Sequence, residues 1–348
     1  MQDHKMSLEQ AAQLVQDLKR DVSQSIFGQE DLIVEAICCL LSGGHILMTG
    51  APGLAKTSLV RVFAKHLHLH FGRVQFTPDL LPSDIIGSDI LNIDPENGRK
   101  AFEFNKGPIF VNLLLADEIN RASPRTQSAL LEAMQERTCT VGAHAHILPD
   151  PFMVFATQNP FESEGAFPLP EAQLDRFLLH TLVDYPDQDA EEKILQAHAQ
   201  SKLVGEQHGA QAQEVAAQRM SVETVKQLIA AKQNVVVPDE LLSVINRLVR
   251  ATRPQDANCP DHLRHLIWYG AGPRAGISLL SVCRSLALLE GSDTVRWRHV
   301  RRLVKPALRH RIKLVVQAQN EQNAEDGFIE SLLTHIEETA HLAVKGWM

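Results

Sequence analysis

The chain has 348 residues, which is too long for one compact α/β core and suits one large and one small domain. Hydrophobic residues make up 44% and charged residues 22% of the chain, a balance that excludes a largely disordered protein. A net charge of -8 and an aromatic content of only 5% argue against a protein built mainly to bind DNA or RNA.

The cellular compartment is predicted from the cysteines and from the pattern of apolar residues. Five cysteines are scattered along the chain and no two form a CxxC pair, which fits a reducing compartment. The first residues are polar, and no apolar run reaches the length that crosses a membrane. We therefore expect a cytoplasmic protein with no membrane span.

The first half of the chain alternates between helical and strand patterns. The periodicity predicts helices over 7–22, 30–41 and 57–68 and strands over 45–49 and 73–76. Turns and short alternating segments follow over 78–107, with a hairpin tip at 94–98 and one hairpin arm at 101–104. The near-continuous apolar run over 109–116 predicts a strand that is buried on both faces.

The pattern continues with a helix over 124–137, a hairpin over 139–147 and strands over 152–157 and 177–183. Such alternation predicts an α/β fold with a doubly wound parallel sheet. After Tyr185-Pro186 helical periodicity dominates, and 205–218 is predicted to be an exposed loop. We expect an N-terminal helix in 1–25, an α/β core in 26–184 and a helical domain in 185–348.

A glycine-rich turn joins the strand over 45–49 to the helix that follows. It departs from the pattern G-x-x-x-x-G-K-[ST] only at Ala55, which replaces the second glycine and is small enough for a helical φ with little crowding. Backbone N–H groups of such a turn converge on phosphates, Lys56 would reach the β- and γ-phosphates, and the Thr57 hydroxyl would bind Mg²⁺. The predicted nucleotide-binding residues are Gly50, Ala51, Pro52, Gly53, Leu54, Ala55, Lys56, Thr57 and Ser58.

Polar side chains follow two of the buried strands. Asp117 and Glu118 end the run over 109–116, and Asn159 follows the strand over 152–157. Ligands of open α/β sheets bind at the carboxyl ends of strands, so Asp117 would hold Mg²⁺ through water and Glu118 would activate the attacking water. Asn159 would bond the γ-phosphate or that water. The alternatives are an acidic helix start for the carboxylates and a turn residue before proline for Asn159.

The order of these motifs resembles the AAA+ superfamily, and several phrases resemble its MoxR family. The phrases are 50–57 (GAPGLAKT), 117–122 (DEINRA), 130–136 (LLEAMQE) and 169–177 (LPEAQLDRF). The alanine at position 55 is usual in that family, and the resemblance runs from Ile26 to about Lys313. It implies a P-loop NTPase core followed by an all-helical lid domain.

The resemblance also implies roles for residues outside the two motifs. Asn159 matches the sensor 1 residue, Arg176 matches an arginine presented to a neighbouring subunit's ATP, and Arg274 matches sensor 2 at the start of a lid helix, in cis or in trans. Gly28 lies in a segment that resembles the one packed beside adenine. A surface ion pair for Arg176, a solvated side chain for Arg274 and an apolar linker around Gly28 are the alternatives.

The function implied by the family is ATP hydrolysis with Mg²⁺, coupled to remodelling or activation of partner proteins. The family also implies a homo-oligomeric ring, a hexamer, and a partner that carries a von Willebrand factor A domain. The segments around Asn97 and Ala143 resemble inserts that line the pore or upper face of such rings. A nucleic-acid motor and a nucleotide-gated binding module with little turnover are the alternatives, against which the acidic charge and the intact Asp117-Glu118 pair respectively argue.

Overall fold

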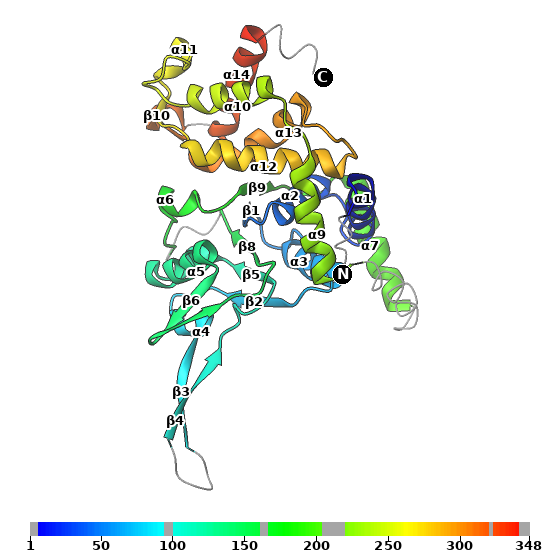
Figure 1. Ribbon diagram of the computed structural model, residues 1–348, viewed down its shortest axis with the longest axis vertical. Coiled ribbons are helices and arrows are strands. Elements are labelled where there is room, and N and C mark those ends of the chain that lie inside the picture. Colours follow the sequence, from blue (N-terminus) through cyan, green and yellow to red (C-terminus); the bar gives the residue numbers. More distant parts are fainter. Residues whose placement is uncertain (1–5, 94–99, 161–165, 204–219, 320–322, 341–348) are drawn as a thin grey trace.

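The computed structural model describes residues 6–93, 100–160, 166–203, 220–319 and 323–340, and a parallel sheet lies at its centre. The sheet has five strands in the order β2-β5-β8-β1-β9 (Figure 1). Its strands are β1 (Ile46–Gly50), β2 (Phe71–Gln75), β5 (Leu113–Asp117), β8 (Met153–Gln158) and β9 (Leu179–Val183). The predicted α/β fold is confirmed, because every neighbouring pair in this sheet is parallel.

Helices cover both faces of the sheet, and each face buries alternate strand residues. The helices of this part are α1 (Leu8–Ser23), α2 (Glu30–Leu41), α3 (Lys56–Leu67), α4 (Pro82–Ile86), α5 (Pro124–Glu136) and α6 (Glu171–Leu174), with the 3₁₀ turn η1 (Ile119–Arg121). Leu113 and Leu115 of β5 pack in the apolar cluster that includes α1, α2 and α3. Leu114 and Ala116 pack in the second cluster, with α5. The period of two along the strand thus divides the core into two layers.

The C-terminal part is a helical lid that packs on one end of the core, as Figure 1 shows. Its elements are α9 (Val222–Ala231), η2 (Lys232–Asn234), α10 (Asp239–Ala251), α11 (Asp261–Arg264), β10 (Ile267–Tyr269), α12 (Pro273–Leu289), α13 (Trp297–Leu308), η3 (Arg309–Arg311), β11 (Lys313–Leu314), η4 (Val316–Ala318) and α14 (Ala324–Thr339). The short antiparallel pair β10–β11 interrupts the helices, so the described part of the lid is not wholly helical. The sheet ends at Val183 and α7 (Gln188–Leu203) follows, while the division after residue 184 stays a prediction.

The lid and the core share one apolar cluster. Helix α2 is buried along most of its length because it packs against α1, α12 and β9. The cluster that holds α1, α2 and α3 also contains the buried residues of α12, α13 and α14. Such continuous burial favours one preferred orientation of the lid on the core.

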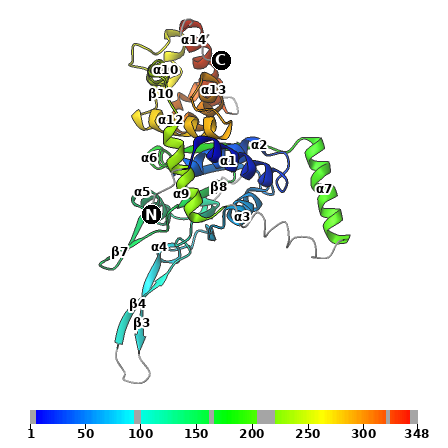
Figure 2. The same ribbon diagram turned by 45° about the vertical axis from the view of Figure 1, so that its right-hand side comes forward.

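Two β-hairpins extend from the core. Strands β3 (Gly87–Ile93) and β4 (Lys100–Lys106) form a long projecting hairpin, and β6 (Thr138–Val141) and β7 (His144–Ile147) form a shorter one (Figure 2). The predicted hairpin tip at 94–98 and the predicted loop at 205–218 lie outside the described residues. None of the helices in the described ranges is long and apolar enough to cross a lipid bilayer.

The apolar run over 109–116 is only partly a strand, which corrects the prediction from the sequence. Strand β5 begins at Leu113, and the four residues before it form turns in which the N–H groups of Asn112 and Leu113 donate to the carbonyl of His70. Ile109 is fully buried, in the second apolar cluster. The run is therefore apolar for two reasons, since its first part fills the core from a loop and its second part lies in the sheet.

Two buried ionisable groups near the sheet have strongly shifted pKa values. His45 uses both ring nitrogens, because Nε2–H donates to the Met134 carbonyl at 3.1 Å and Nδ1 accepts from the Val154 N–H at 3.0 Å. Burial lowers its pKa to about 3, aided by the charge of Arg137. Burial raises the pKa of Glu35 to about 7, although a hydrogen bond from Thr181 opposes the shift. The folded chain therefore favours the neutral form of both groups.

These shifts predict opposite effects on stability as the pH falls from 6.5 to 4.5. In this range the unfolded chain binds a proton at His45 and the folded chain does not. His45 therefore lowers the free energy of unfolding by up to about 1.4 kcal/mol for each pH unit that the pH falls. Glu35 acts in the opposite sense, because the folded chain protonates it first. Urea unfolding across this range should show a weaker acid destabilisation for His45→Gln and a stronger one for Glu35→Gln. Equal slopes for both variants and the wild type would contradict the assignment.

Candidate nucleotide site at the ends of the parallel strands

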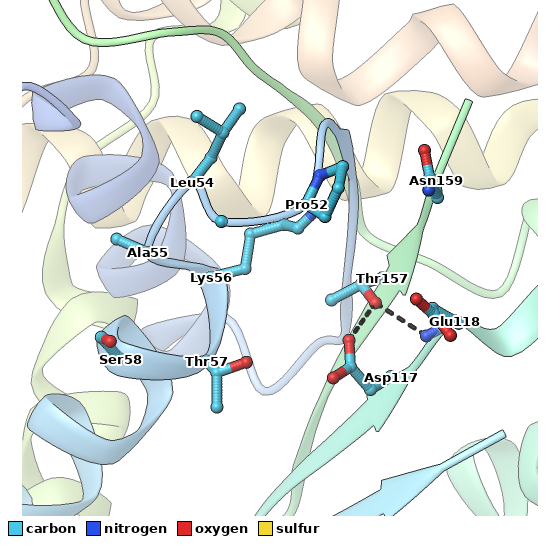
Figure 3. Close-up of a pocket in the computed structure, with 11 residues that line it drawn as sticks. Pro52, Leu54, Ala55, Lys56, Thr57, Ser58, Asp117, Glu118, Thr157 and Asn159 are labelled. Atoms are coloured by element: carbon cyan, nitrogen blue, oxygen red, sulfur yellow. Dashed lines mark hydrogen bonds between the residues drawn. The ribbon is translucent and has the colours of Figure 1, made fainter. Parts of the chain in front are cut away.

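A cavity of about 240 Å³ lies at the carboxyl ends of β1, β5 and β8. It is lined by Pro52, Gly53, Leu54, Ala55, Lys56, Thr57, Ser58, Asp117, Glu118, Thr157 and Asn159. Figure 3 shows the glycine-rich loop and the start of α3 on one side, and the two acidic residues, Thr157 and Asn159 on the other. The structure therefore brings the loop motif, the acid pair and Asn159 around one cavity.

The glycine-rich loop has two positions where the backbone conformation matters. A Cβ on Gly50 would lie 2.4 Å from the Val183 carbonyl oxygen, so the close contact between β1 and β9 requires glycine there. Ala55 has a φ of +58°, so it is left-handed and not right-handed as in a helix. This conformation costs an alanine roughly 1–2 kcal/mol, yet it turns the chain so that α3 begins at Lys56. The N-terminus of α3 then faces the cavity with unpaired N–H groups.

The ammonium of Lys56 folds back onto the loop. Its Nζ donates to the Gly50 carbonyl at 2.5 Å and to the Ala51 carbonyl at 3.2 Å. Burial lowers the pKa of Lys56, while the negative charges of Asp117 and Glu118 oppose the shift. The side chain thus lies among its own loop's carbonyls, with phosphate-sized space beside it.

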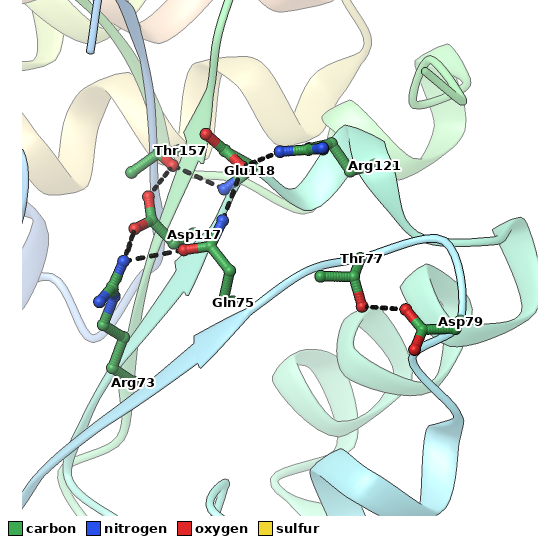
Figure 4. Close-up of polar contacts among 8 residues, drawn as sticks. All are labelled: Arg73, Gln75, Thr77, Asp79, Asp117, Glu118, Arg121 and Thr157. Carbon is green, nitrogen blue, oxygen red and sulfur yellow. Dashed lines mark hydrogen bonds and ion pairs between the residues drawn. The ribbon is translucent and has the colours of Figure 1, made fainter. Parts of the chain in front are cut away.

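Asp117 is held from two sides at the end of β5. Thr157 Oγ1 donates to Asp117 Oδ1 at 2.6 Å, and Arg73 Nη2 donates to Oδ2 at 2.7 Å. The Thr157 oxygen also accepts the Glu118 N–H at 2.8 Å. One buried hydroxyl on β8 therefore ties together Asp117, the last residue of β5, and Glu118, which follows it (Figure 4).

Glu118 has a left-handed backbone, with φ at +56°, and its side chain has two partners. Gln75 Nε2 donates to Glu118 Oε2 at 2.6 Å, and Arg121 Nη1 lies 2.9 Å from the same oxygen (Figure 4). A strained backbone at the end of a buried strand is a frequent feature of functional sites. Both partners contact Oε2, so Oε1 is the oxygen that could accept a proton from water.

Three partners of Asp117 and Glu118 were not predicted from the sequence. Arg73 and Gln75 are on β2, which pairs with β5 so that Gln75 lies opposite Asp117. Because Arg73 and Gln75 are two residues apart on the strand, their side chains lie on the same face of the sheet. Thr157 is the third, on the neighbouring strand β8. The order of the strands is what brings these residues together, and no local motif states that order.

Comparisons with known proteins agree with this geometry. Residues 45–179 match the family described as "ATPase family associated with various cellular activities (AAA)", and residues 264–332 match an AAA lid domain. The chain is 40% identical over 298 residues to Chaperone MoxR1 of Mycobacterium tuberculosis, covering 86% of this chain and 75% of that protein. The chain belongs to the MoxR family of AAA+ ATPases.

Two further similarities extend over most of the chain. Protein MoxR of Paracoccus denitrificans is 31% identical, covering 86% of this chain and 88% of that protein. A crystal structure of a Cytophaga hutchinsonii protein superposes with a TM-score of 0.81 at 35% identity, covering 93% of this chain and 94% of the other. The MoxR resemblance seen in the sequence is thus confirmed, and it includes the lid.

The cavity wall does not include five of the predicted site residues, which are Gly28, Gly50, Ala51, Arg176 and Arg274. Arg176 and Arg274 do not line it, and Arg274 Nη1 lies 3.3 Å from Asp175 Oδ2. Gly28 is also absent from the cavity wall. A Cβ there would lie 2.8 Å from the Cβ of Pro186, so Gly28 packs against the chain that leaves β9.

The residues predicted to hold Mg²⁺ fit a hard cation. Thr57 and Asp117 line the same cavity, and they offer a hydroxyl and a carboxylate oxygen, which are the donors that Mg²⁺ prefers. Arg73 forms an ion pair with Asp117, and its guanidinium balances the negative charge of that carboxylate. A cation at Asp117 would compete with Arg73 for the same oxygen.

Replacing Thr157 with valine tests the link between the two acidic residues. The change keeps the shape of a fully buried side chain, removes a hydrogen bond to Asp117 and leaves the Glu118 N–H without its acceptor. We expect ATP turnover to fall about 10- to 100-fold, the usual effect of losing a residue that orients a metal ligand. Thr157→Ser keeps the hydroxyl and should retain turnover. Phosphate release over a Mg²⁺ titration measures both, and wild-type turnover in Thr157→Val would contradict the role.

Proposed function

We propose that this MoxR-family protein hydrolyses ATP and uses the hydrolysis cycle to remodel or activate partner proteins. The observation that carries the proposal is the convergence of the Lys56-Thr57 loop and the Asp117-Glu118 pair on one cavity. A triphosphate in that cavity would meet backbone N–H groups and the Lys56 ammonium on one side. It would meet the carboxylates of Asp117 and Glu118 on the other.

Each residue around the cavity has a chemical task in this proposal. The N-terminus of α3 and Lys56 bind the phosphates, and Thr57 and Asp117 hold Mg²⁺, which neutralises charge on the β- and γ-phosphates. Glu118 accepts a proton from the attacking water, while Gln75 and Arg121 hold its Oε2 oxygen. Asn159 donates to the γ-phosphate or to that water from the end of β8.

The position of Arg176 supports assembly into a homo-oligomer. Arg176 follows α6 and does not line the cavity of its own chain, so an arginine that completes the site would come from a neighbouring copy. A guanidinium at that site stabilises the charge on the phosphoryl group as it is transferred. We propose a closed ring, in which each chain supplies Arg176 to the next, and the family resemblance makes a hexamer the expected size.

The remodelling part of the proposal is supported by relatives. One relative, MoxR1, is named a chaperone and shares 40% identity over most of this chain. A partner that carries a von Willebrand factor A domain stays a prediction from the family resemblance. Capture of clients by Glu118→Gln in ATP, followed by mass spectrometry, would identify the partner.

Glu118→Gln separates an ATPase from a nucleotide-gated binding module. The amide keeps the size of the side chain and cannot take a proton from water, so phosphate release should fall by roughly 100-fold or more. ATP affinity should stay close to wild type, because the loop and Lys56 are unchanged. Phosphate release and fluorescent-nucleotide titration measure the two quantities. Equal turnover in the two proteins, or none in either, would favour the binding module.

Mixing two inactive variants tests the shared site. Arg176→Ala should bind ATP normally but turn over slowly, since its loop, Lys56 and acid pair are intact. A chain with Glu118→Gln still carries Arg176 and can supply it to a neighbour that has Glu118. Phosphate release by the mixture should therefore exceed that of either variant alone. A mixture no more active than its components would contradict a site built from two chains.

A further inference from the structure

The segment that carries Arg176 has few apolar anchors, and within α6 Leu174 is only partly buried against the second apolar cluster. Helix α6 has only four residues, and none of them is buried. Phe177, directly after Arg176, is fully buried and anchors one end of the segment. A helix this short has little stability of its own, so contacts with other parts of the chain must set its position.

The lid supplies those contacts through Arg311 of η3. Its side chain is only 2% exposed, and its Nε donates to Asp175 Oδ1 at 2.8 Å. Its Nη2 donates to the Phe177 carbonyl at 2.8 Å. A single guanidinium thus bonds the residue before Arg176 and the residue after it.

Arg311 is itself fixed within the lid. Its Nη1 donates to the Ala307 carbonyl at 2.7 Å, and its Nη2 lies 3.1 Å from Ser278 Oγ on α12. A planar guanidinium with five N–H donors can join two lid elements to the chain around Arg176, whereas a lysine offers one point charge. Helix α6 lies directly against the lid in Figure 1.

We propose that Arg311 is a positioning residue for Arg176, and that it sets where Arg176 stands by holding the chain on either side of it. This inference rests on the proposed function, in which Arg176 acts at the site of a neighbouring chain. Arg311 does not line the nucleotide cavity. Its effect reaches the reaction only through the placement of Arg176.

The carboxylate of Asp175, the residue before Arg176, also contacts a second lid arginine. Asp175 Oδ2 lies 3.3 Å from Arg274 Nη1, while its other oxygen accepts from Arg311. Asp175 therefore receives one arginine from the start of α12 and one from η3. Any shift of the lid relative to the core moves both donors, and through Asp175 it moves Arg176. The position of the lid in one chain is thus linked to the site of the next chain.

The test begins with Arg311→Met, which has a similar length but neither charge nor N–H donors. Arg176 should lose its fixed position, and a displacement near 1 Å at a catalytic group lowers kcat roughly 100-fold. ATP affinity and KM should stay near wild type, because the nucleotide cavity does not include this residue. Arg311→Lys keeps the charge beside Asp175 and should recover part of kcat.

Mixing with Glu118→Gln then distinguishes positioning from general damage. The Arg311→Met chain has an intact acid pair and lacks only a well-placed Arg176, which its Glu118→Gln neighbour provides. Mixed samples should regain turnover as Arg176→Ala mixtures do. If Arg176→Ala mixtures recover and Arg311→Met mixtures do not, the positioning role is overturned while the proposed function stands. If neither recovers, the site shared between two chains is overturned, and the positioning role with it.

Two further variants control for folding. Arg309→Met removes another mostly buried arginine of η3, which pairs with Asp326 and does not contact 175–177, and it should keep turnover close to wild type. Loss of turnover in Arg309→Met equal to that in Arg311→Met would overturn the specific role. If Arg311→Met does not fold, Asp175→Asn carries the test. This change removes the negative charge of the part-exposed Asp175 carboxylate, which Arg311 contacts. It should show the same fall in kcat and the same recovery in the mixture.

Discussion

The parallel sheet is the constraint on which the rest of this structure depends. Strands that run in one direction end at one edge, so β1, β5 and β8 deliver their last residues to the same place. Three segments separated by many residues in the chain thereby contribute a phosphate-binding loop, two acids and an amide to one cavity. The buried faces of the strands hold this arrangement with ordinary apolar packing, and the polar residues need only follow the strands.

Charge pairs hold the acidic and basic side chains in place around the cavity. The carboxylates of Asp117 and Glu118 pair with Arg73 and Arg121, and Lys56 donates to carbonyls of its own loop. In the proposed complex, the phosphates and Mg²⁺ would take the places of some of these partners. Binding therefore exchanges one set of charge pairs for another, and the net change in free energy is smaller than the new contacts alone suggest.

The lid takes part in both the fold and the proposed chemistry. It shares one apolar cluster with α1, α2 and one face of the sheet, which favours a single docked orientation. Three neighbouring lid residues also bond the chain around Arg176, because His310 and Arg311 donate to the Phe177 carbonyl and Lys313 pairs with Glu171. Apolar packing thus holds the lid on the core, while these polar contacts make the position of Arg176 depend on the position of the lid.

The sequence by itself determined what is local and contiguous. The eight residues of the phosphate loop, the acid pair at a strand end and the MoxR phrases are each recognisable over a few positions, and helical or strand periodicity placed most elements within a few residues. The partners of the acids, Arg73, Gln75 and Thr157, came only from the tertiary structure, because strand order and register decide which side chains meet. The same holds for Arg311, which lies 136 residues from Asp175 along the chain. The turn over 109–112 and the left-handed Ala55 were also decided by packing and chain direction, which no run of apolar or small residues expresses.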